Sequence, residues 1–436
     1  MRFGTDGVRG RANTELTAAF ALDLGRAAAR VLGGRAAVVG GDSRISTPML
    51  EAALVAGLTS EGVDVIRLGI APTPAVAFEA ARRGVFGAVV SASHNPYHDN
   101  GIKLFAVGGT KLPDSTEAEI ERSLSTLPSP SGEPGAVEQS ASLDGYVDHL
   151  WSVLDGRRLD GVKLVVDAAN GAASELVGPV FRGAGAEVVV INASPDGRNI
   201  NAGCGATHIA TLQAAVVAEG AQAGIALDGD GDRMIAVDEQ GGVVDGDHVI
   251  AICAGDLRQR GLLRNDTVVV TVMTNLGFRL AMRDRGIDVV ETPVGDRYVL
   301  EVLTDQGHSL GGEQSGHVIF PDHATTGDGM LTGLVLLDVL RRSGTTLSQL
   351  GRQAMTSLPQ VLVNVPVPSP LPGIAQLLAS EIETASATLG ESGRVLVRAS
   401  GTEPLVRVMV EAPTHELAVA IAERLADAAR LHAATA

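Results

Sequence analysis

The sequence predicts an α/β protein of several domains, with largely parallel sheets and a smaller α+β unit at the carboxyl end. Strand-like apolar runs alternate with helical segments over most of the chain, which is typical of parallel sheets. The chain has 436 residues, and at roughly 150 residues per domain it fits about three domains, with room for four small ones. Its 53 glycines and 3% aromatic residues favour tight strand-to-helix turns over a β-sandwich.

The net charge limits the classes of partner, and the cysteines and apolar runs indicate the compartment. The formal net charge is −17, which argues against nucleic acid and anionic membranes, although a small phosphorylated ligand responds only to the local field. Cys204 and Cys253 have no C-x-x-C spacing and read as buried apolar side chains in a reducing compartment. The amino terminus lacks a signal-peptide run, and the longest apolar run, 330–340, contains Asp338. We therefore expect a soluble cytoplasmic protein.

The first part of the chain alternates helices and strands. Apolar residues recur every fourth position from Leu16 to Ala28, which predicts an amphipathic helix over 14–32. Thr47-Pro48 opens a second helix. A segment rich in Ser, Pro and Gly at 129–135 indicates the end of this unit. Strands are expected at 36–39, 63–68 and 86–90, and a further helix near 75–82.

The alternation continues in the rest of the chain. A strand–Asn–Gly–helix order at 165–172 recurs at 267–277, which is a limited sign of repeated α/β domains. From 361 onward, strands combine with helices in an α+β pattern. Strands are expected at 163–166, 187–191, 223–227, 267–272, 287–291, 361–367, 395–399 and 405–411, a hairpin at 235–244, and helices at 208–219, 329–341 and 374–388 and from residue 415.

A polar loop follows the apolar run 86–90. Ser93 and His94 stand just beyond this strand, and ligands bind at the carboxyl ends of strands in open α/β sheets. Asn100-Gly101 is read as a turn, after which Lys103 could point back at the Ser93 hydroxyl. Taken alone, the segment is better explained as an ordinary polar loop, so its function depends on the rest of the chain.

Asp228, Asp230 and Asp232 are separated by single glycines at the end of a strand. Such close carboxylates repel one another unless a cation lies among them, and hard oxygen ligands suit magnesium or calcium. A calcium hand is the rival interpretation, and Glu239 occupies its twelfth position. However, its sixth position requires glycine and holds Arg233, and the flanking helices are missing. The context favours a magnesium site, with a bare structural turn as the third interpretation.

A second cluster combines arginines with hydroxyl groups near the carboxyl end. Arg398 and Arg407 carry guanidinium groups, and Ser400 and Thr402 supply hydroxyls on a glycine-containing loop. Such a loop can cradle a dianionic phosphate. The alternative is a charged surface turn in which Glu403 pairs with one of the arginines. The spacing favours phosphate.

Two further segments offer polar groups. A glycine-bounded loop carries Glu313, Gln314, Ser315 and His317, which can hydrogen-bond sugar hydroxyls or an amine, although alone it is more simply a polar loop. Near the amino terminus, Arg9 lies among glycines and can grip an anion or be solvated in a flexible tail. A cleft between domains would bring a nucleophile, a metal site, a polar loop and a phosphate cradle together.

Five short motifs follow one another along the chain: FGTDGVRG at 3–10, ASHNP at 92–96, DGDGDR at 228–233, GEQSGH at 312–317 and RASGTEP at 398–404. In this combination they are highly specific, and with them the chain resembles the α-D-phosphohexomutase family along essentially its whole length. Gln314 and VGDRY at 294–298 are similar to the branch of the family that acts on glucosamine phosphates. His98 stands where many relatives have a second tyrosine.

The resemblance implies four domains around a central cleft. Three would be related α/β domains with mixed, largely parallel sheets, and the fourth a smaller α+β domain at the carboxyl end. We expect a domain with the phosphoserine loop at 1–144, one with the magnesium loop at 145–246, one with the sugar-binding loop at 247–358, and a phosphate-binding domain at 359–436.

The resemblance also implies roles for single residues. Ser93 is expected to carry a phosphoryl group, and one magnesium ion to be held by an oxygen of that group with Asp228, Asp230 and Asp232. Lys103 is expected to act as general acid and base, with its pKa lowered by a cationic neighbourhood. The other residues are expected to act as follows: His94, Arg9 and Arg233 near the transferred group; Glu313, Gln314 and Ser315 at the sugar; and Arg398, Ser400, Gly401, Thr402 and Arg407 at the non-reacting phosphate.

The implied reaction interconverts glucosamine 6-phosphate and glucosamine 1-phosphate, on the route to UDP-N-acetylglucosamine and cell-wall precursors. Glucosamine 1,6-bisphosphate would be both intermediate and activator. The expected partner is a small phosphosugar, with neither nucleic acid nor membrane, and a homodimer is allowed. Three alternatives stay open: phosphomannomutase or phosphoglucomutase activity, a magnesium-dependent sugar phosphatase, and a non-catalytic sugar-phosphate sensor.

Overall fold

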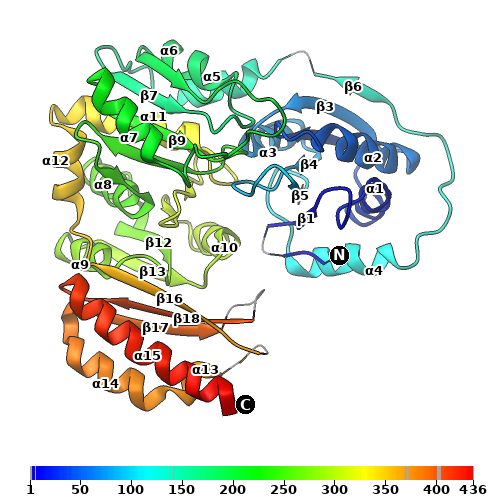
Figure 1. The fold of residues 1–436 in the computed structure, drawn as a ribbon. Helices are drawn as coiled ribbons and strands as arrows, with labels where there is room; N and C mark the ends of the chain where they lie inside the picture. The colour runs from blue at the N-terminus through cyan, green and yellow to red at the C-terminus, as the bar shows by residue number, and fades with distance from the viewer. Residues whose placement is uncertain are drawn as a thin grey trace. The chain divides into compact units, whose positions relative to one another are not determined.

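The computed structural model describes residues 2–4, 6–140, 142–368, 371, 373–399 and 404–435. The chain forms two compact units (Figure 1), one of residues 1–273 and 287–354 and the other of residues 274–286 and 355–436. The first unit contains three sheets of mixed strand direction covered by helices, and the second contains one antiparallel sheet. The predicted α/β class with a smaller carboxyl-terminal α+β part is confirmed.

The first sheet has the strand order β1-β5-β4-β2-β3-β6. Helices cover both of its faces, because neighbouring residues of one strand point to opposite sides: Val38 packs with the cluster that includes α3, and Val39 with the cluster that includes α1 and α2. The strands are β1 Val8–Arg11, β2 Ala36–Gly41, β3 Asp64–Ile70, β4 Phe86–Val90, β5 Asp99–Phe105 and β6 Val137–Gln139; the helices are α1 Ala18–Leu32, α2 Thr47–Ser60, α3 Thr73–Arg83 and α4 Asp114–Leu124.

The turn expected at Asn100-Gly101 is wrong, because both residues lie inside β5. Gly101 pairs with Arg9 of β1, and a Cβ atom added to Gly101 would lie 2.5 Å from the carbonyl oxygen of Ser91. The Asn100 amide donates to Ser46 Oγ at 2.9 Å. Gly101 therefore allows a close approach of two backbone segments, and Asn100 forms a buried hydrogen bond. Both needs come from residues far away in the sequence, and the Asn-Gly pair that meets them resembles a turn signal.

Helices α1 and α2 approach closely through glycine. A Cβ atom on Gly57 would lie 2.1 Å from the Leu22 carbonyl oxygen. We expect Gly57→Ala to lower the free energy of unfolding by about 1–3 kcal/mol, because the backbone it meets cannot rotate away as a side chain can. Gly255→Ala is the matched control, since a Cβ there meets no atom within 4 Å and alanine favours a helix by roughly 0.5–1 kcal/mol. Urea unfolding checks both, and equal stability of the two variants would contradict this packing.

The second sheet carries the acidic loop. Its order is β11-β10-β9-β7-β8, with β7, β8 and β9 parallel and β10 antiparallel to β9. The loop between β9 and β10 therefore leaves the carboxyl end of the parallel part, where side chains gather in open α/β sheets. The elements are α5 Asp144–Ser152, β7 Lys163–Asp167, α6 Val177–Gly183, β8 Glu187–Ile191, α7 Ala210–Glu219, β9 Ala223–Leu227, β10 Met234–Asp238 and β11 Val243–Val244.

The third sheet has the order β13-β12-β14-β15. Its short antiparallel pair, β14 and β15, holds the segment predicted to bind sugar. The elements are α8 Gly246–Gln259, a 3-10 turn Arg264–Asp266, β12 Thr267–Thr271, β13 Asp288–Thr292, α10 Asp296–Gln306, β14 Gly311–Gly312, β15 Val318–Ile319, α11 Gly329–Ser343 and α12 Leu347–Ala354.

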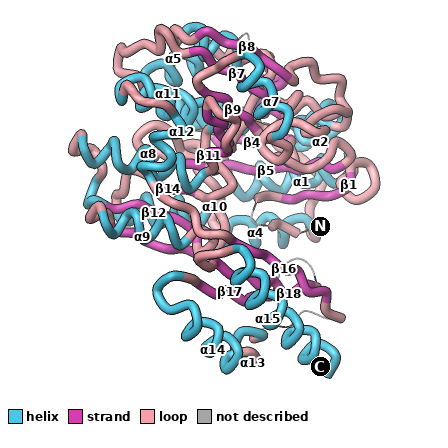
Figure 2. The backbone as a smooth tube through the Cα atoms, turned by 60° about the vertical axis from the view of Figure 1, so that its left-hand side comes forward, coloured by secondary structure: helices cyan, strands magenta, loops and turns pink. Residues whose placement is uncertain are grey.

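The second unit is an antiparallel sheet of order β16-β18-β17 with helices packed on it. Helix α15 packs against β16 and β18 (Figure 2). The helix expected at 374–388 is two helices that meet at Leu378. The elements are α9 Leu276–Asp284, β16 Gln360–Pro366, α13 Ile374–Leu377, α14 Ala379–Leu389, a 3-10 turn Gly390–Ser392, β17 Arg394–Ala399, β18 Leu405–Glu411 and α15 His415–Thr435. None of the helices in the described part of the chain has both the length and the apolar composition for a bilayer crossing.

Candidate active site

Ser93 lies just beyond β4 in a left-handed backbone conformation, with φ +50°. This region is unfavourable for a residue with a side chain and persists where surrounding contacts enforce it. The backbone N–H of Ser93 donates to Ser91 Oγ at 3.0 Å, and its carbonyl accepts from Asn201 at 2.9 Å. Ser93 Oγ is thereby held 2.5 Å from Asp228 Oδ2 and 3.3 Å from His94 Nδ1. The structure brings the predicted nucleophile to the acidic loop.

The side chain of Arg44 holds the backbone of the Ser93 loop in place, and the sequence did not predict this role. Its side chain is fully buried, paired with Asp42 at 2.8 Å, and donates to the carbonyl oxygens of Ser93, Asn95 and Pro96. Three backbone acceptors on one guanidinium fix the path of the loop, which a flexible ammonium could not do. No local sequence signal distinguishes Arg44 from a surface arginine, since the carbonyl groups that it binds are about fifty residues away.

We expect Arg44→Met to lower the free energy of unfolding by about 3–5 kcal/mol, because it leaves the Asp42 carboxylate buried without its cation. Arg158→Met is the control, since Arg158 pairs with Asp160 where both are more than half exposed and such pairs contribute below about 1 kcal/mol. Chemical denaturation followed by circular dichroism measures both. A loss no larger than that of the control would contradict the supporting role.

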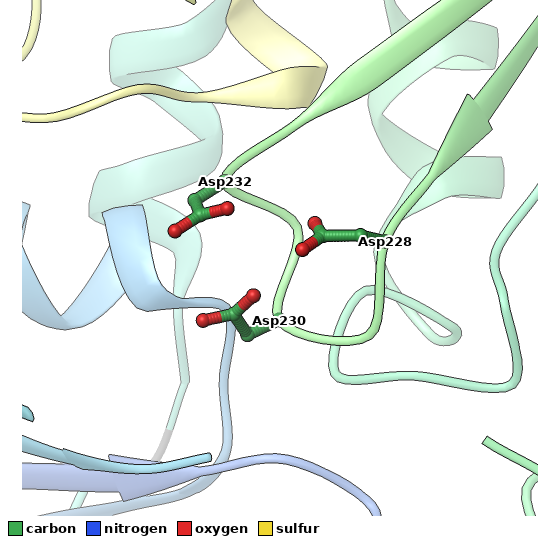
Figure 3. Close-up of side chains that lie close together, drawn as sticks. All are labelled: Asp228, Asp230 and Asp232. Carbon is green, nitrogen blue, oxygen red and sulfur yellow. The ribbon is translucent and has the colours of Figure 1, made fainter. Parts of the chain in front are cut away.

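Asp228, Asp230 and Asp232 converge from the loop between β9 and β10 (Figure 3). Each offers a carboxylate oxygen within 4.8 Å of the others, and all three side chains are buried. Asp230 Oδ1 has no hydrogen-bond donor among the described residues. Burial, with Asp232 and Asp230 nearby, holds the pKa of Asp228 well above its usual value. This set of hard, mutually repelling oxygen donors fits a divalent cation such as magnesium.

Lys103 points from β5 into the same carboxylates. Its Nζ lies 2.8 Å from Asp230 Oδ2, 3.1 Å from Asp232 Oδ2 and 3.4 Å from Asp6 Oδ2. Burial alone would disfavour the ammonium, but these three carboxylates outweigh it and hold the pKa of Lys103 well above its usual value. The cationic neighbourhood expected around Lys103 is therefore wrong: acidic groups from two sequence-distant segments surround it.

Three further predicted residues lie around this centre. Arg9 forms an ion pair with Asp6, and Arg233 Nε lies 3.8 Å from Asp232 Oδ1. Burial, together with the positive charges of Arg233 and Arg9, lowers the pKa of His94 to about 4. At neutral pH, His94 is therefore an uncharged imidazole, which can orient an oxygen by hydrogen bonding.

The predicted sugar loop connects β14 and β15. Glu313 Oε1 accepts from the backbone N–H of Gly295, and Ser315 Oγ lies 3.4 Å from Glu313 Oε2. Gln314 is directed elsewhere: its Nε2 donates to Asp245 Oδ2 at 3.3 Å, and its carbonyl accepts from Gly246 at 3.0 Å. Gln314 thus fixes the loop to the start of α8, where Asp245 caps the helix.

The predicted phosphate cradle is described in part. Arg398 of β17 and Arg407 of β18 face each other as Cα partners in the antiparallel ladder. Burial, and then the neighbouring charge of Arg407, lowers the pKa of Arg398. Two guanidinium groups on adjacent strands would both gain from an anion. Ser400, Gly401 and Thr402 lie outside the described residues.

Comparison with known families shows to which family the chain belongs. Family models of phosphoglucomutase/phosphomannomutase match four consecutive parts of the chain: alpha/beta/alpha domain I at 1–130, domain II at 144–242, domain III at 245–358 and the C-terminal domain at 362–428. The chain belongs to this family.

Relatives within the phosphoglucomutase/phosphomannomutase family cover almost the whole chain. Phosphoglucosamine mutases of Salinispora arenicola and Frankia casuarinae are each 55% identical to it, covering 98% of this chain and 98% of the relative. Among solved structures, a phosphoglucomutase/phosphomannomutase family protein of Burkholderia thailandensis is 28% identical, with a TM-score of 0.83 and 98% of each chain covered. The chain is thus an enzyme of the phosphohexomutase type.

Proposed function

We propose that this chain is a phosphoglucosamine mutase that interconverts glucosamine 6-phosphate and glucosamine 1-phosphate through a phosphoserine at Ser93. The observation that carries the proposal is Ser93 Oγ, held 2.5 Å from Asp228 and next to the other two carboxylates of the acidic loop. Full-length similarity to phosphoglucosamine mutases supports the substrate. We also propose the cytoplasm as the place of the reaction, as predicted from the sequence.

The residues divide the transfer between them. As the bond between Ser93 Oγ and phosphorus breaks, a substrate hydroxyl oxygen bonds to phosphorus, and one proton passes in net from that hydroxyl to Ser93 Oγ. Lys103, held as an ammonium by the same carboxylates, is our candidate to donate the proton that Ser93 Oγ receives, and the proton of the substrate hydroxyl then restores it. His94, uncharged, orients the group beside Ser93 Oγ. Arg9 and Arg233 neutralise charge on the transferred oxygens.

Asp228, Asp230 and Asp232 would hold one magnesium ion together with the phosphoryl group on Ser93. When bound, such an ion supplies positive charge that stabilises the transferred group. Two neighbouring side chains already hold these carboxylates in place. Thr73 Oγ1 donates a hydrogen bond to Asp230 Oδ2 at 2.6 Å, and Lys103 forms ion pairs with Asp230 and Asp232. Both contacts orient the acidic side chains before any cation arrives.

The remaining predicted residues would bind the substrate. Glu313 and Ser315 would hydrogen-bond the sugar, with Gln314 fixing their loop. Arg398 and Arg407, with Ser400, Gly401 and Thr402, would grip the phosphate that is not reacting. Glucosamine 1,6-bisphosphate would then form, reverse its orientation and return its other phosphate to Ser93.

Turnover of three substrates tests this proposal. The 6-phosphates of glucosamine, glucose and mannose are supplied separately with magnesium and the matching 1,6-bisphosphate, and phosphorus NMR follows the products. We expect the highest kcat/KM for the glucosamine compound. Higher kcat/KM for glucose or mannose would support the phosphoglucomutase or phosphomannomutase alternative, and inorganic phosphate without 1-phosphate would indicate a phosphatase. Light scattering measures the mass in solution and so tests whether the chain forms the homodimer that the prediction allows.

A further inference from the structure

The segment at 294–298 has no role in the mechanism above, although it makes three separate sets of contacts. Gly295, at φ +134°, donates its N–H to Glu313 Oε1 at 3.2 Å. Asp296 pairs with Lys111 and lies 3.1 Å from His317 Nε2. Arg297 pairs with Asp114 and donates to Glu117 Oε1 at 2.8 Å. The short turn at the start of α10 therefore makes three contacts: Gly295 with the sugar loop, Asp296 with His317, and Arg297 with α4.

These contacts form a crossed pair of charges between two parts of the family fold. Lys111 and Glu117 belong to the part that matches domain I, and Asp296 and Arg297 to the part that matches domain III. Each side offers one cation and at least one anion, so a shifted alignment would bring like charges together. The side chains of Lys111, Asp296, Arg297 and Glu117 are all about one-tenth exposed, which weakens screening by solvent.

The charge network continues from this contact to the reaction centre. Lys111 Nζ also lies 3.1 Å from Asp6 Oδ1, and the other oxygen of Asp6 lies 3.4 Å from Lys103. On the opposite side, His317 Nδ1 lies 3.7 Å from Asp232 Oδ1. A displacement of Asp296 would therefore change the electrostatic surroundings of Lys103, through Lys111 and Asp6, and those of Asp232, through His317.

We propose that Arg297 is a positioning residue that fixes the sugar loop relative to the phosphoserine loop, through its grip on α4. Ser93 and Lys103 are carried by the domain I part and Glu313 by the domain III part, so this contact sets the span across which the phosphoryl group is transferred. Such spans tolerate little error, since a displacement of about 1 Å can lower a rate by about 100-fold. The inference rests on the proposed function.

The test compares Arg297→Gln with wild type in the full chain with magnesium. We expect kcat to fall between about 10- and 100-fold, and turnover without added glucosamine 1,6-bisphosphate to decay faster, because the intermediate escapes from a loosened site. Glu117→Gln is expected to produce the same pattern, as its partner. The control is Arg342→Gln, which removes an arginine paired with Asp256 and Asp338 in the same unit but away from these loops; its kcat is expected to stay within twofold of wild type.

Charge reversal distinguishes an ion pair from a general packing effect. Arg297→Glu is expected to be nearly inactive, and adding Glu117→Arg to it is expected to restore part of kcat. Arg297→Lys, which keeps the charge and loses the two-pronged contact, replaces Arg297→Gln if the latter fails to fold. A folded Arg297 variant with kcat within twofold of wild type, or an equal loss in Arg342→Gln, overturns the proposal. Only ratios to wild type are used, so absence of wild-type turnover on glucosamine 6-phosphate refutes the proposed function instead.

Discussion

Replacing Ser93 with alanine is expected to abolish isomerisation, with kcat lower by about 10⁴-fold or more. The hydroxyl that would hold the phosphoryl group is removed, and no other described hydroxyl lies against Asp228 in the same way. The fold should persist, because the contacts that fix the loop are made by the backbone of Ser93 and not by its Oγ. Turnover assays with glucosamine 6-phosphate measure the loss, and peptide mass spectrometry follows the phosphate.

The control for this variant is Ser125→Ala. Ser125 is exposed and its hydroxyl bonds only to a carbonyl of its own helix turn. It should keep wild-type turnover and a phosphate on the peptide that contains Ser93, whereas Ser93→Ala should lack both and still bind phosphosugar. Retained mutase turnover in Ser93→Ala would refute the covalent route.

Asp228→Asn is expected to remove both the response to magnesium and most of the activity. In wild type, an ion that binds only the folded state stabilises it by about 2.7 kcal/mol at one hundred times its Kd. The amide of asparagine is neutral and a weaker ligand, so this gain should be lost and kcat should fall by about 10³-fold, a size typical for loss of one main electrostatic contact.

Without metal, the same variant should be at least as stable as wild type. Asp228 is buried beside two other carboxylates, and its raised pKa reports that its charge is unfavourable there. Thermal unfolding in EDTA and then in magnesium separates the two effects. Asp288→Asn, on an exposed position of β13, is the control and should respond to magnesium as wild type does. A magnesium-dependent rise in Tm that survives in Asp228→Asn would contradict the assigned metal site.

The sequence predicted those features that depend on near neighbours. The strand at 86–90 was readable because five apolar residues precede a polar loop, and β4 has these bounds. The acidic triplet was readable because its three ligands lie within five residues of one another. The same local reasoning misread Asn100-Gly101, where the absence of a Cβ atom on Gly101 allows the close approach of Ser91 next to the pairing with β1.

Other features of the site depend on partners far away in the sequence. Arg44 supports the Ser93 loop, and Arg297 contacts α4 across 180 residues. Arg44 shows no local pattern, and the VGDRY motif marks Arg297 without indicating its partner, because an arginine that binds distant carbonyls or carboxylates resembles any other arginine in the sequence. Only folding reveals which of them is buried.

The sequence by itself determined which groups can do the chemistry: a serine after a buried strand, and three aspartates whose mutual repulsion calls for a cation. The tertiary structure decided which charges surround these groups and the neighbouring Lys103. Lys103 and Asp230 are 127 residues apart, yet their contact makes the surroundings of Lys103 acidic instead of cationic. Spacing along the chain shows only close neighbours, whereas charge interactions act through space and are strengthened where folding excludes water.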